Sequence, residues 1–288
     1  MTVAYSLREL EVQPRAVAIG TFDGVHAGHR AVIAAAVARA GTPTVVTFDP
    51  HPRSVLGGGV ELLTTLERRL ELIGECGVED ILVVPFDEAV AALEPEAFAG
   101  EYLLSLGTQT VVAGKGFRFG RERRGDLALL SALGLEAVEV PLVEGVSSTQ
   151  LRELIRAGKV GEAAPLLGRP VEVDGQVVGG DHRGAGLGFP TANLDVAPEL
   201  LVPANGIYAG AVGDRRAAVS IGVNPHFGGT QRRVEAYLLD WGGDLYGDRL
   251  VVELWQRLRD ERAFASDEEL VEQIARDVEQ TRAAIRPV

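Results

Sequence analysis

Short apolar runs alternate with helix-forming segments up to about residue 158. The runs that predict strands are residues 16–19, 44–48, 81–84, 110–113 and 137–140. The segments that predict helices are residues 30–40, 66–76, 88–106 (interrupted near Pro95), 127–133 and 151–157. Alternation of this kind is typical of an α/β domain, in which helices cover both faces of a parallel sheet.

The pattern changes after a short helical link at residues 160–168. Closely spaced strand-like runs follow at residues 171–178, 207–212, 217–222, 234–239 and 250–254. Residues 213–214 and 241–244 read as hairpin turns. Strands without helices between them predict an antiparallel barrel or sandwich. We therefore expect a boundary between 160 and 170, giving domains at residues 1–165 and 166–288.

A helix is predicted at the end of the chain. Ser266 and Glu269 form a capping box that marks its start. Val271, Ile274, Val278 and Ile285 form an apolar stripe at helical spacing. We expect this stripe to pack against the barrel.

Composition and charge narrow the classes of partner. The 288-residue chain carries a net charge of −13, which disfavours a broad nucleic-acid surface. The single cysteine, Cys76, excludes an internal disulfide and reads as a packed thiol. No signal pattern and no apolar run of about 18 residues is present, so we expect a cytoplasmic protein without a membrane partner. Monomer and homo-oligomer both remain open.

A glycine-punctuated turn between a strand and a helix carries two histidines. The stretch reads Gly20-Thr21-Phe22-Asp23-Gly24-Val25-His26-Ala27-Gly28-His29. Backbone N–H groups and the helix dipole converge at such a turn and favour an anion. His26 and His29 can donate hydrogen bonds to phosphate oxygens. The alternatives are a helix cap, a packing residue or a metal ligand, but two histidines without a third ligand make a weak zinc site.

Three further loops follow predicted strands or open helices. The first contains Asp49, His51 and two prolines that favour an extended loop. In the second, Phe117 and Arg118 belong to a basic stretch that suits a planar ring bearing a phosphate. In the third, residues 147–149 carry hydroxyls that can cap a helix, and Arg152 lies in its first turn. The alternatives are a structural turn, a solvated basic loop and simple capping.

The second half carries its own candidate chemistry. A Gly-rich loop ends in Gly186-Leu187-Gly188-Phe189-Pro190-Thr191-Ala192-Asn193. The Thr191 hydroxyl and the Asn193 carbonyl oxygen are hard donors that suit Mg²⁺. Strand alternation places Glu235 on the face of Tyr237 and Leu239. If that face points inward, Glu235 suits a general base; if it points outward, Glu235 is a solvated carboxylate.

Both halves resemble one family, the bacterial bifunctional riboflavin kinase/FMN adenylyltransferases. The resemblance lies in the stretch from Gly20 to His29, in the loops around residues 48–52, 117–120 and 147–152, and in the Gly-x-Pro-Thr-Ala-Asn and Val-Glu-x-Tyr segments of the second half. It implies a Rossmann-like nucleotidyltransferase domain and a β-barrel riboflavin kinase domain with a terminal helix. It also implies that riboflavin is phosphorylated to FMN with ATP and Mg²⁺, and that FMN is adenylylated to FAD.

The resemblance assigns roles residue by residue. It implies that His26 and His29 are catalytic in adenylyl transfer and that Glu235 is the base of the kinase. It implies ATP contacts of the adenylyltransferase at Gly20, Phe22, Asp23, Gly28, Ser147, Ser148, Thr149 and Arg152, and flavin contacts there at Asp49, His51, Phe117 and Arg118. For the kinase it implies ATP contacts at Gly186, Gly188, Thr191 and Asn193, flavin contacts at Asn224 and Phe227, and metal ligands at Thr191 and Asn193.

Two departures keep other functions open. Gly116 stands where the family usually has Asn or Asp, and His226 stands where it usually has Thr. A flavin-binding module, or an enzyme with one degenerate site, would explain both. A nucleotidyltransferase for another phosphorylated acceptor, such as pantetheine phosphate, would explain His26 and His29 but not the Gly-x-Pro-Thr-Ala-Asn segment.

Overall fold

The chain divides into two compact units, each with its own core. The computed structural model describes residues 1–179, 188–223 and 232–288. The first unit consists of Met1–Glu61 and Leu66–Ser147, and the second of Leu62–Thr65 and Ser148–Val288. Among the described residues, no helix is long and apolar enough to cross a membrane.

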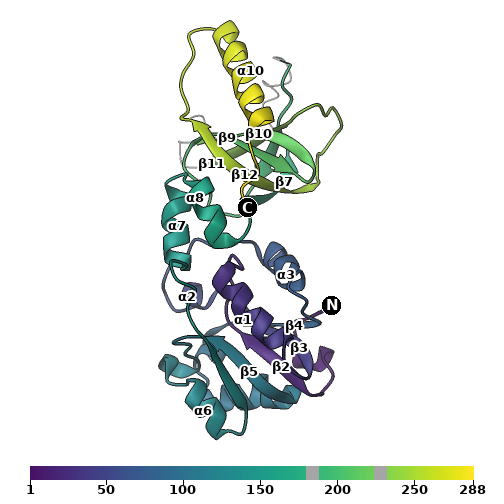
Figure 1. Cartoon of the computed structure of the whole chain (residues 1–288), viewed down its shortest axis with the longest axis vertical. Coiled ribbons are helices and arrows are strands. Elements are labelled where there is room, and N and C mark those ends of the chain that lie inside the picture. The colour runs from purple at the N-terminus through teal and green to yellow at the C-terminus, as the bar shows by residue number, and fades with distance from the viewer. Residues whose placement is uncertain (180–187, 224–231) are drawn as a thin grey trace. The chain divides into compact units, whose positions relative to one another are not determined.

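A six-stranded parallel sheet forms the centre of the first unit (Figure 1). Its strands are β1 (Thr2–Ala4), β2 (Arg15–Ile19), β3 (Thr42–Asp49), β4 (Asp80–Pro85), β5 (Thr108–Gly114) and β6 (Glu136–Val140), in the order β1-β4-β3-β2-β5-β6. The predicted α/β class is confirmed. Only β1 lacked a sequence signal, because three residues are too few to show a period.

Helices cover both faces of this sheet. They are α1 (Ala27–Val37), α2 (Pro52–Val55), α3 (Leu66–Gly74), α4 (Glu88–Ala91), α5 (Pro95–Tyr102) and α6 (Leu127–Ala132), with 3-10 turns η1 (Leu7–Glu9), η2 (Leu104–Leu106) and η3 (Arg121–Arg123). Side chains of α1 and α3 share a core with one face of the strands, and those of α5 and α6 share a core with the other. The interruption expected near Pro95 within residues 88–106 is confirmed, since α4 ends at Ala91 and Pro95 starts α5 at its first turn.

A closed antiparallel barrel forms the second unit (Figure 1). Its strands are β7 (Val171–Val178), β8 (Ala192–Asp195), β9 (Gly206–Val212), β10 (Arg215–Val223), β11 (Arg232–Leu238) and β12 (Arg249–Arg259), in the order β10-β11-β8-β7-β12-β9. Valine, leucine and isoleucine side chains fill the interior. The predicted barrel is confirmed, although β8 was missed because it lies inside the Gly-rich stretch.

The two predicted hairpin turns had different outcomes. Gly213 and Asp214 join β9 to β10, which pair directly, so this turn is confirmed. The turn predicted at residues 241–244 is wrong, because β11 pairs with β8 and β10 whereas β12 pairs with β7 and β9. The segment after β11 therefore crosses between strands that are not neighbours.

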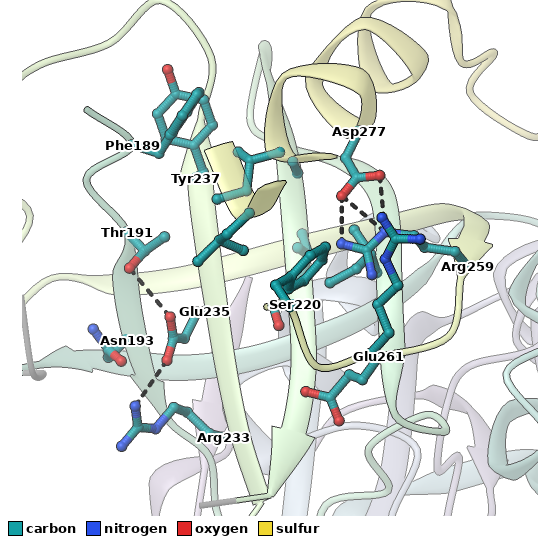
Figure 2. A pocket seen from close by; sticks show the side chains of 17 residues that line it. Phe189, Thr191, Asn193, Ser220, Arg233, Glu235, Tyr237, Arg259, Glu261 and Asp277 are labelled. Atoms are coloured by element: carbon teal, nitrogen blue, oxygen red, sulfur yellow. Dashed lines mark hydrogen bonds and ion pairs between the residues drawn. The ribbon is translucent and has the colours of Figure 1, made fainter. Parts of the chain in front are cut away.

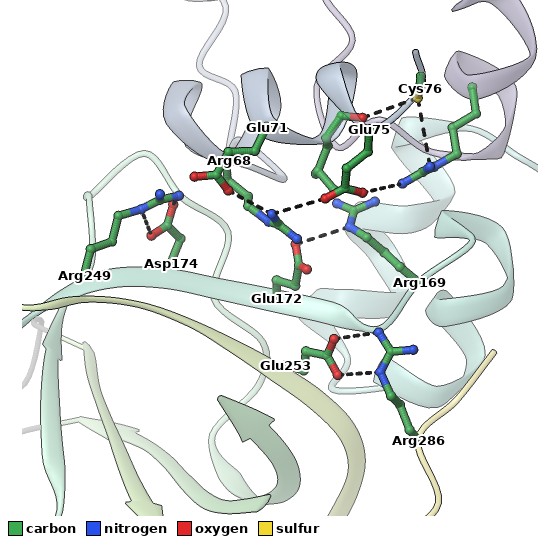
Figure 3. A network of polar contacts seen from close by, with 12 residues as sticks. Arg68, Glu71, Glu75, Cys76, Arg169, Glu172, Asp174, Arg249, Glu253 and Arg286 are labelled. Atoms are coloured by element: carbon green, nitrogen blue, oxygen red, sulfur yellow. Dashed lines mark hydrogen bonds and ion pairs between the residues drawn. The ribbon is translucent and has the colours of Figure 1, made fainter. Parts of the chain in front are cut away.

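In the part of the second unit that the structure describes, the helices are α7 (Ser148–Arg156), α8 (Val160–Leu167) and α10 (Asp267–Ala283), which pack on the barrel or beside it. Leu151 and Ile155 of α7 belong to the same apolar core as the barrel interior. Ion pairs on the barrel join Arg249 to Asp174 and Arg286 to Glu253 (Figure 3).

Helix α10 starts where the capping box predicted, but its buried face coincides only in part with the predicted stripe. The Ser266 hydroxyl accepts a hydrogen bond from the Glu269 amide at 3.3 Å. The apolar stripe is wrong at its end, since Ile285 lies beyond the helix and is 85% exposed. Polar side chains share the buried face with Val278: these are Gln273, Asp277 and Thr281. Their partners on the barrel, described below, explain why polar residues can be buried there.

Candidate active sites

The loop that carries the two histidines leaves the sheet at its topological switch point. The strand order runs from β2 through β3 to β4 on one side and from β2 to β5 and β6 on the other. Open α/β sheets bind ligands where the order reverses, outside the carboxyl ends of the strands. The loops after β2, β3 and β5, which contain the predicted site residues of this unit, leave neighbouring strands at that edge.

The two imidazole rings are stacked. The ring centroids of His26 and His29 are 3.6 Å apart with an interplanar angle of 17°, and Phe22 meets His29 edge-on at 5.4 Å. His26 is the N-cap of α1, and its Nδ1 accepts a hydrogen bond from the His29 amide at 3.3 Å. The helix starts three residues earlier than predicted, at Ala27. The capping alternative is therefore correct for His26, and the same contact orients the ring.

Gly28 makes this stack possible. A Cβ at Gly28 would lie 3.1 Å from Cε1 and 3.2 Å from Nδ1 of His26, closer than most Cβ contacts. Asp23 is buried just before the histidines, and Gly20 donates its amide proton to the carbonyl of Val46. The loop predicted to bind nucleotide is thus a well-packed turn.

Asp49 and His51 lie in the loop after β3. The two prolines do not keep this loop extended, since Pro52 starts the short helix α2 and His51 caps it by accepting from the Arg53 amide at 3.2 Å. The Asp49 carboxylate accepts a hydrogen bond from Arg69 of α3 at 3.3 Å. Sequence reasoning did not single out Arg69, because an arginine in an amphipathic helix reads as a surface residue.

The loop after β5 is basic; its Lys115, Gly116 and Arg118 are exposed, whereas Phe119 is buried in the core of the first unit. Phe117 stacks on Phe119 with centroids 5.7 Å apart, and Arg118 donates to Asp126 at 3.0 Å. Gly116 has φ of +76° with open space where a Cβ would lie, a conformation that Asn and Asp also tolerate. The partly buried Phe117 beside the exposed Arg118 guanidinium can contact a flat anionic ligand.

The last loop predicted to contact ATP spans the division of the chain into its two units. Ser147 ends the first unit, whereas Ser148, Thr149 and Arg152 belong to α7 in the second. Arg152 is buried and donates to the Ser148 carbonyl at 3.2 Å. Their part in nucleotide binding stays a prediction.

A cavity of about 430 Å³ opens between the wall of the barrel and α10 (Figure 2). It brings together Thr191, Asn193 and Glu235, which sequence reasoning had selected separately. Asn193 of β8 and Glu235 of β11 are cross-strand partners, and the Thr191 hydroxyl donates to Oε2 of Glu235 at 3.4 Å. Arg233 donates to the other carboxylate oxygen at 3.1 Å.

Glu235 does not face the apolar core of the barrel. Val234, Ala236 and Leu238 are the interior residues of β11, so Glu235 and Tyr237 point outward. Of the two alternatives left open for Glu235, the inward face is wrong, and the outward carboxylate is not freely solvated. The outer face of β11 lines the cavity under α10, which keeps Glu235 half-buried among polar partners.

The α10 side of the cavity combines apolar and charged groups that sequence reasoning missed. Phe264, Leu270 and Ile274 supply apolar surface. Arg259 of β12 makes a forked contact with Asp277 at 2.7–3.0 Å. Glu261 also lines the cavity, and its burial, together with Glu235, raises its pKa against the opposing effect of Arg259. No local sequence signal links these residues, because they come from a strand, a loop and a helix.

A second cavity of about 460 Å³ lies on the other side of β8. Thr191 and Asn193 line both cavities. The second is also lined by Ala236 and Leu238 of β11, by the segment from Trp241 to Tyr246, by Pro190 and Ala192 and by the end of β7. Gly188, next to these residues, has φ of +85°. The predicted sites at Gly186, Asn224 and Phe227, and the departure at His226, lie outside the described residues.

The donor set around Thr191 fits Mg²⁺ bound together with nucleotide phosphates. Mg²⁺ prefers oxygen ligands and usually takes only one or two from the protein, with phosphates and water supplying the rest. The Thr191 hydroxyl and the Asn193 carbonyl oxygen are such donors at the junction of the two cavities. Within residues 1–179, 188–223 and 232–288, no group of three His, Cys, Asp or Glu side chains could hold a metal ion.

Comparisons with known proteins cover both units. A family model described as FAD synthetase matches residues 9–152, and one described as riboflavin kinase matches residues 167–285. A bifunctional riboflavin kinase/FMN adenylyltransferase from Listeria monocytogenes is 37% identical over 93% of this chain and 92% of its own. One from Bacillus subtilis is 35% identical over 96% of this chain and 94% of its own.

A solved structure shares the fold. The crystal structure of a protein described as a macrolide-efflux protein from Streptococcus pneumoniae matches with a TM-score of 0.86 and 30% identity, over 97% of this chain and 98% of that one. A nucleotidyltransferase-type sheet and a kinase-type barrel in one chain define a transferase with two nucleotide-handling halves. The chain belongs to the bifunctional riboflavin kinase/FMN adenylyltransferase family.

Proposed function

We propose that the two reactions of this family are divided between residues 1–165, which adenylylate FMN, and residues 166–288, which phosphorylate riboflavin. As a member of the family, the chain is a transferase that makes flavin cofactors from riboflavin and ATP. The observation that carries the division is the convergence of Thr191, Asn193 and Glu235 at one cavity of the barrel. Cytoplasmic location and oligomeric state stay predictions from the sequence.

In the barrel, the two cavities suit the two substrates. Flavin fits the cavity under α10, which offers Phe264, Leu270 and Ile274 as apolar surface. The nucleotide fits the cavity on the other side of β8. Thr191 and Asn193 line both, so they can hold Mg²⁺ and the phosphates between the two substrates. Mg²⁺ would neutralise charge on these phosphates.

Glu235 is the base in this proposal. Its carboxylate takes the proton of the terminal ribityl hydroxyl, whose oxygen bonds to the γ-phosphorus while the bond from that phosphorus to the bridging oxygen of ADP breaks. Thr191 and Arg233 each donate to one carboxylate oxygen and so fix the orientation of the group. Phosphoryl transfer depends mainly on such positioning and on charge neutralisation.

In the sheet domain, the phosphate of FMN is the nucleophile, so the reaction needs no nucleophile from the protein. A phosphate oxygen of FMN bonds to the α-phosphorus of ATP, and the bond between that phosphorus and the pyrophosphate oxygen breaks. His26 and His29 would stabilise the developing negative charge as hydrogen-bond donors. Gly20, Phe22, Asp23, Gly28, Ser147, Ser148, Thr149 and Arg152 are proposed for ATP, and Asp49, His51, Phe117 and Arg118 for FMN.

Glu235→Gln and His29→Ala together test the division of labour. Glu235→Gln should lower FMN formation from riboflavin by about 10²–10⁴-fold, the usual contribution of a general base, and leave FAD formation from supplied FMN intact. His29→Ala should show the reverse, with a loss in FAD formation of about 10²–10³-fold. Both reactions are measured by chromatographic separation of flavins after incubation with ATP and Mg²⁺.

Full FMN formation by Glu235→Gln would remove the carboxylate from the mechanism, and full FAD formation by His29→Ala would remove the imidazole. Tight flavin binding by the unmodified chain without either product would instead identify a flavin-binding module. Adenylylation of pantetheine phosphate in place of FMN would assign the first unit to another acceptor.

A further inference from the structure

One buried arginine connects the two loops that the proposed function assigns to ATP and to FMN. Arg69 lies on α3, and 2% of its surface is exposed. Its guanidinium donates to the Thr21 carbonyl at 3.1 Å, to the Phe48 carbonyl at 3.2 Å and to the Asp49 carboxylate at 3.3 Å. Each acceptor lies at or just after the carboxyl end of β2 or β3.

The anchored segments lead directly to the proposed substrate contacts. Thr21 is followed by Phe22, whose φ of +50° is unusual for a side chain of its size, and the loop then reaches His26. Such a conformation persists only where the surrounding structure holds it. The Thr21 carbonyl accepts a second hydrogen bond, from the Thr47 hydroxyl at 3.1 Å. Two hydrogen-bond donors, Arg69 and Thr47, thus fix the Thr21 carbonyl at the start of residues 20–29, here called the histidine loop.

The burial of Arg69 is costly for the fold. Desolvation lowers the pKa of Arg69, although the carboxylates of Asp23 and Asp49 act in the opposite direction. Its Nε is buried without a hydrogen-bond partner among the described residues. A buried charge whose desolvation is incompletely compensated contributes little to stability compared with an apolar side chain of similar size. The geometry that Arg69 imposes on the two loops explains its place better than stability does.

We propose that Arg69 is a positioning residue for adenylyl transfer, which holds the histidine loop and the Asp49 loop at one fixed spacing. The inference rests on the proposed assignment of these loops to ATP and FMN. A planar guanidinium can reach three acceptors in a fixed geometry, which a lysine ammonium cannot do. Misplacement of bound reactants by about 1 Å can cost roughly 10²-fold in rate.

The bifunctional chain provides its own control, since riboflavin phosphorylation is assigned to the other unit. Arg69→Met should lower kcat/KM for FAD formation by about 10²-fold and raise KM for both ATP and FMN, while FMN formation is unchanged. Arg69→Lys keeps the charge and should recover substrate affinity more than kcat. Steady-state kinetics of both reactions in the same preparations give these values.

Arg15→Met is a matched structural variant. Arg15 is fully buried on β2 at the opposite end of the strand, where it donates to Thr44, to Asp80 and to the Glu11 carbonyl. Its replacement should lower the thermal midpoint but leave kcat for FAD formation close to that of the unmodified chain. This comparison separates loop positioning from a general loss of stability.

Thr47→Val is a second test that removes no charge. It deletes the other donor to the Thr21 carbonyl, and we expect a smaller loss confined to FAD formation. Equal loss of FAD formation in Arg69→Met and Arg15→Met, or a parallel loss of both activities, would overturn the inference. If His29→Ala abolishes FAD formation while Arg69→Met and Thr47→Val do not reduce it, the proposed function stands and only the role of Arg69 fails. Full FAD formation in His29→Ala would instead refute the assignment of the histidine loop.

Discussion

The contact between His26 and the His29 amide has a chemical consequence. Because Nδ1 of His26 accepts that N–H, it carries no proton, and the proton of the neutral ring must be on Nε2. Helix capping thus selects the tautomer in which Nε2 is a donor, as contact with a phosphate oxygen requires. The stacking on His29 restrains the ring further. The hydrogen bond from the His29 amide therefore sets both the tautomer and the orientation in which His26 can donate to a phosphate oxygen.

Gly28→Ala tests this restraint. The added methyl group would meet the His26 ring at 3.1 Å, so the ring has to move. Alanine is the better helix former by up to about 1 kcal/mol, which offsets the steric cost in stability. We expect FAD formation to fall at least about tenfold, the equivalent of 1.4 kcal/mol, with an unchanged or higher thermal midpoint.

Kinetics of FAD formation and thermal unfolding on the same sample give both values. A variant with full FAD formation would show that the position of the His26 ring is unimportant.

Helix α10 depends on polar contacts to hold its place over the kinase cavity. Asp277 is buried, accepts the forked contact from Arg259 and also accepts from Gln273 at 2.8 Å. Arg216 donates to the carbonyls of Thr281 and Ala284 at the end of the helix. Since these contacts fix α10, they also fix the apolar wall that Leu270 and Ile274 give to the cavity.

Asp277→Ala should loosen α10 and so displace Leu270 and Ile274 from the cavity wall. Removing one partner of a buried ion pair leaves Arg259 uncompensated and costs about 3 kcal/mol of the free energy of unfolding. We expect a raised KM for riboflavin and unchanged FAD formation from FMN, measured by denaturant unfolding and steady-state kinetics. Glu279→Ala, an exposed site on the same helix, is the control and should change stability by less than about 1 kcal/mol. An unaltered KM for riboflavin in Asp277→Ala would show that α10 does not shape the flavin site.

At the scale of the whole molecule, the two reactions are consecutive. In the proposed division, the product of the barrel, FMN, is the substrate of the sheet domain. Each unit has a separate apolar core. A variant inactive in one unit should therefore keep the other activity. This holds whatever path FMN takes between the sites.

A mixture of Glu235→Gln and His29→Ala should convert riboflavin to FAD, although neither variant does so alone. The reason is that His29→Ala releases FMN, which Glu235→Gln then adenylylates. Flavin chromatography over a time course measures the yield. Absence of FAD from the mixture, with each partial reaction intact, would mean that FMN does not pass between chains.

Periodic elements could be predicted from the sequence, but contacts between distant segments could not. The strands of both units other than β1 and β8, and the start of α10, followed from apolar period and capping residues, because these signals are local. The segment between the end of β11 and the start of β12 was predicted to be a hairpin turn, because no local sequence signal shows which strands pair. Glu235 was selected as a candidate base with its face left open, since alternation separates two faces without saying which is covered.

The sequence by itself determined two nucleotide-handling halves, the histidine turn and the Thr191, Asn193 and Glu235 set, because each depends on residue type and local spacing. Only the tertiary structure decided that Glu235 lies under α10, that Asp277 is buried against Arg259 and that Arg69 joins two loops. Those contacts link residues that are 18 to 48 positions apart in the chain. Tertiary packing brings these residues together, and no local pattern in the sequence indicates that they are in contact.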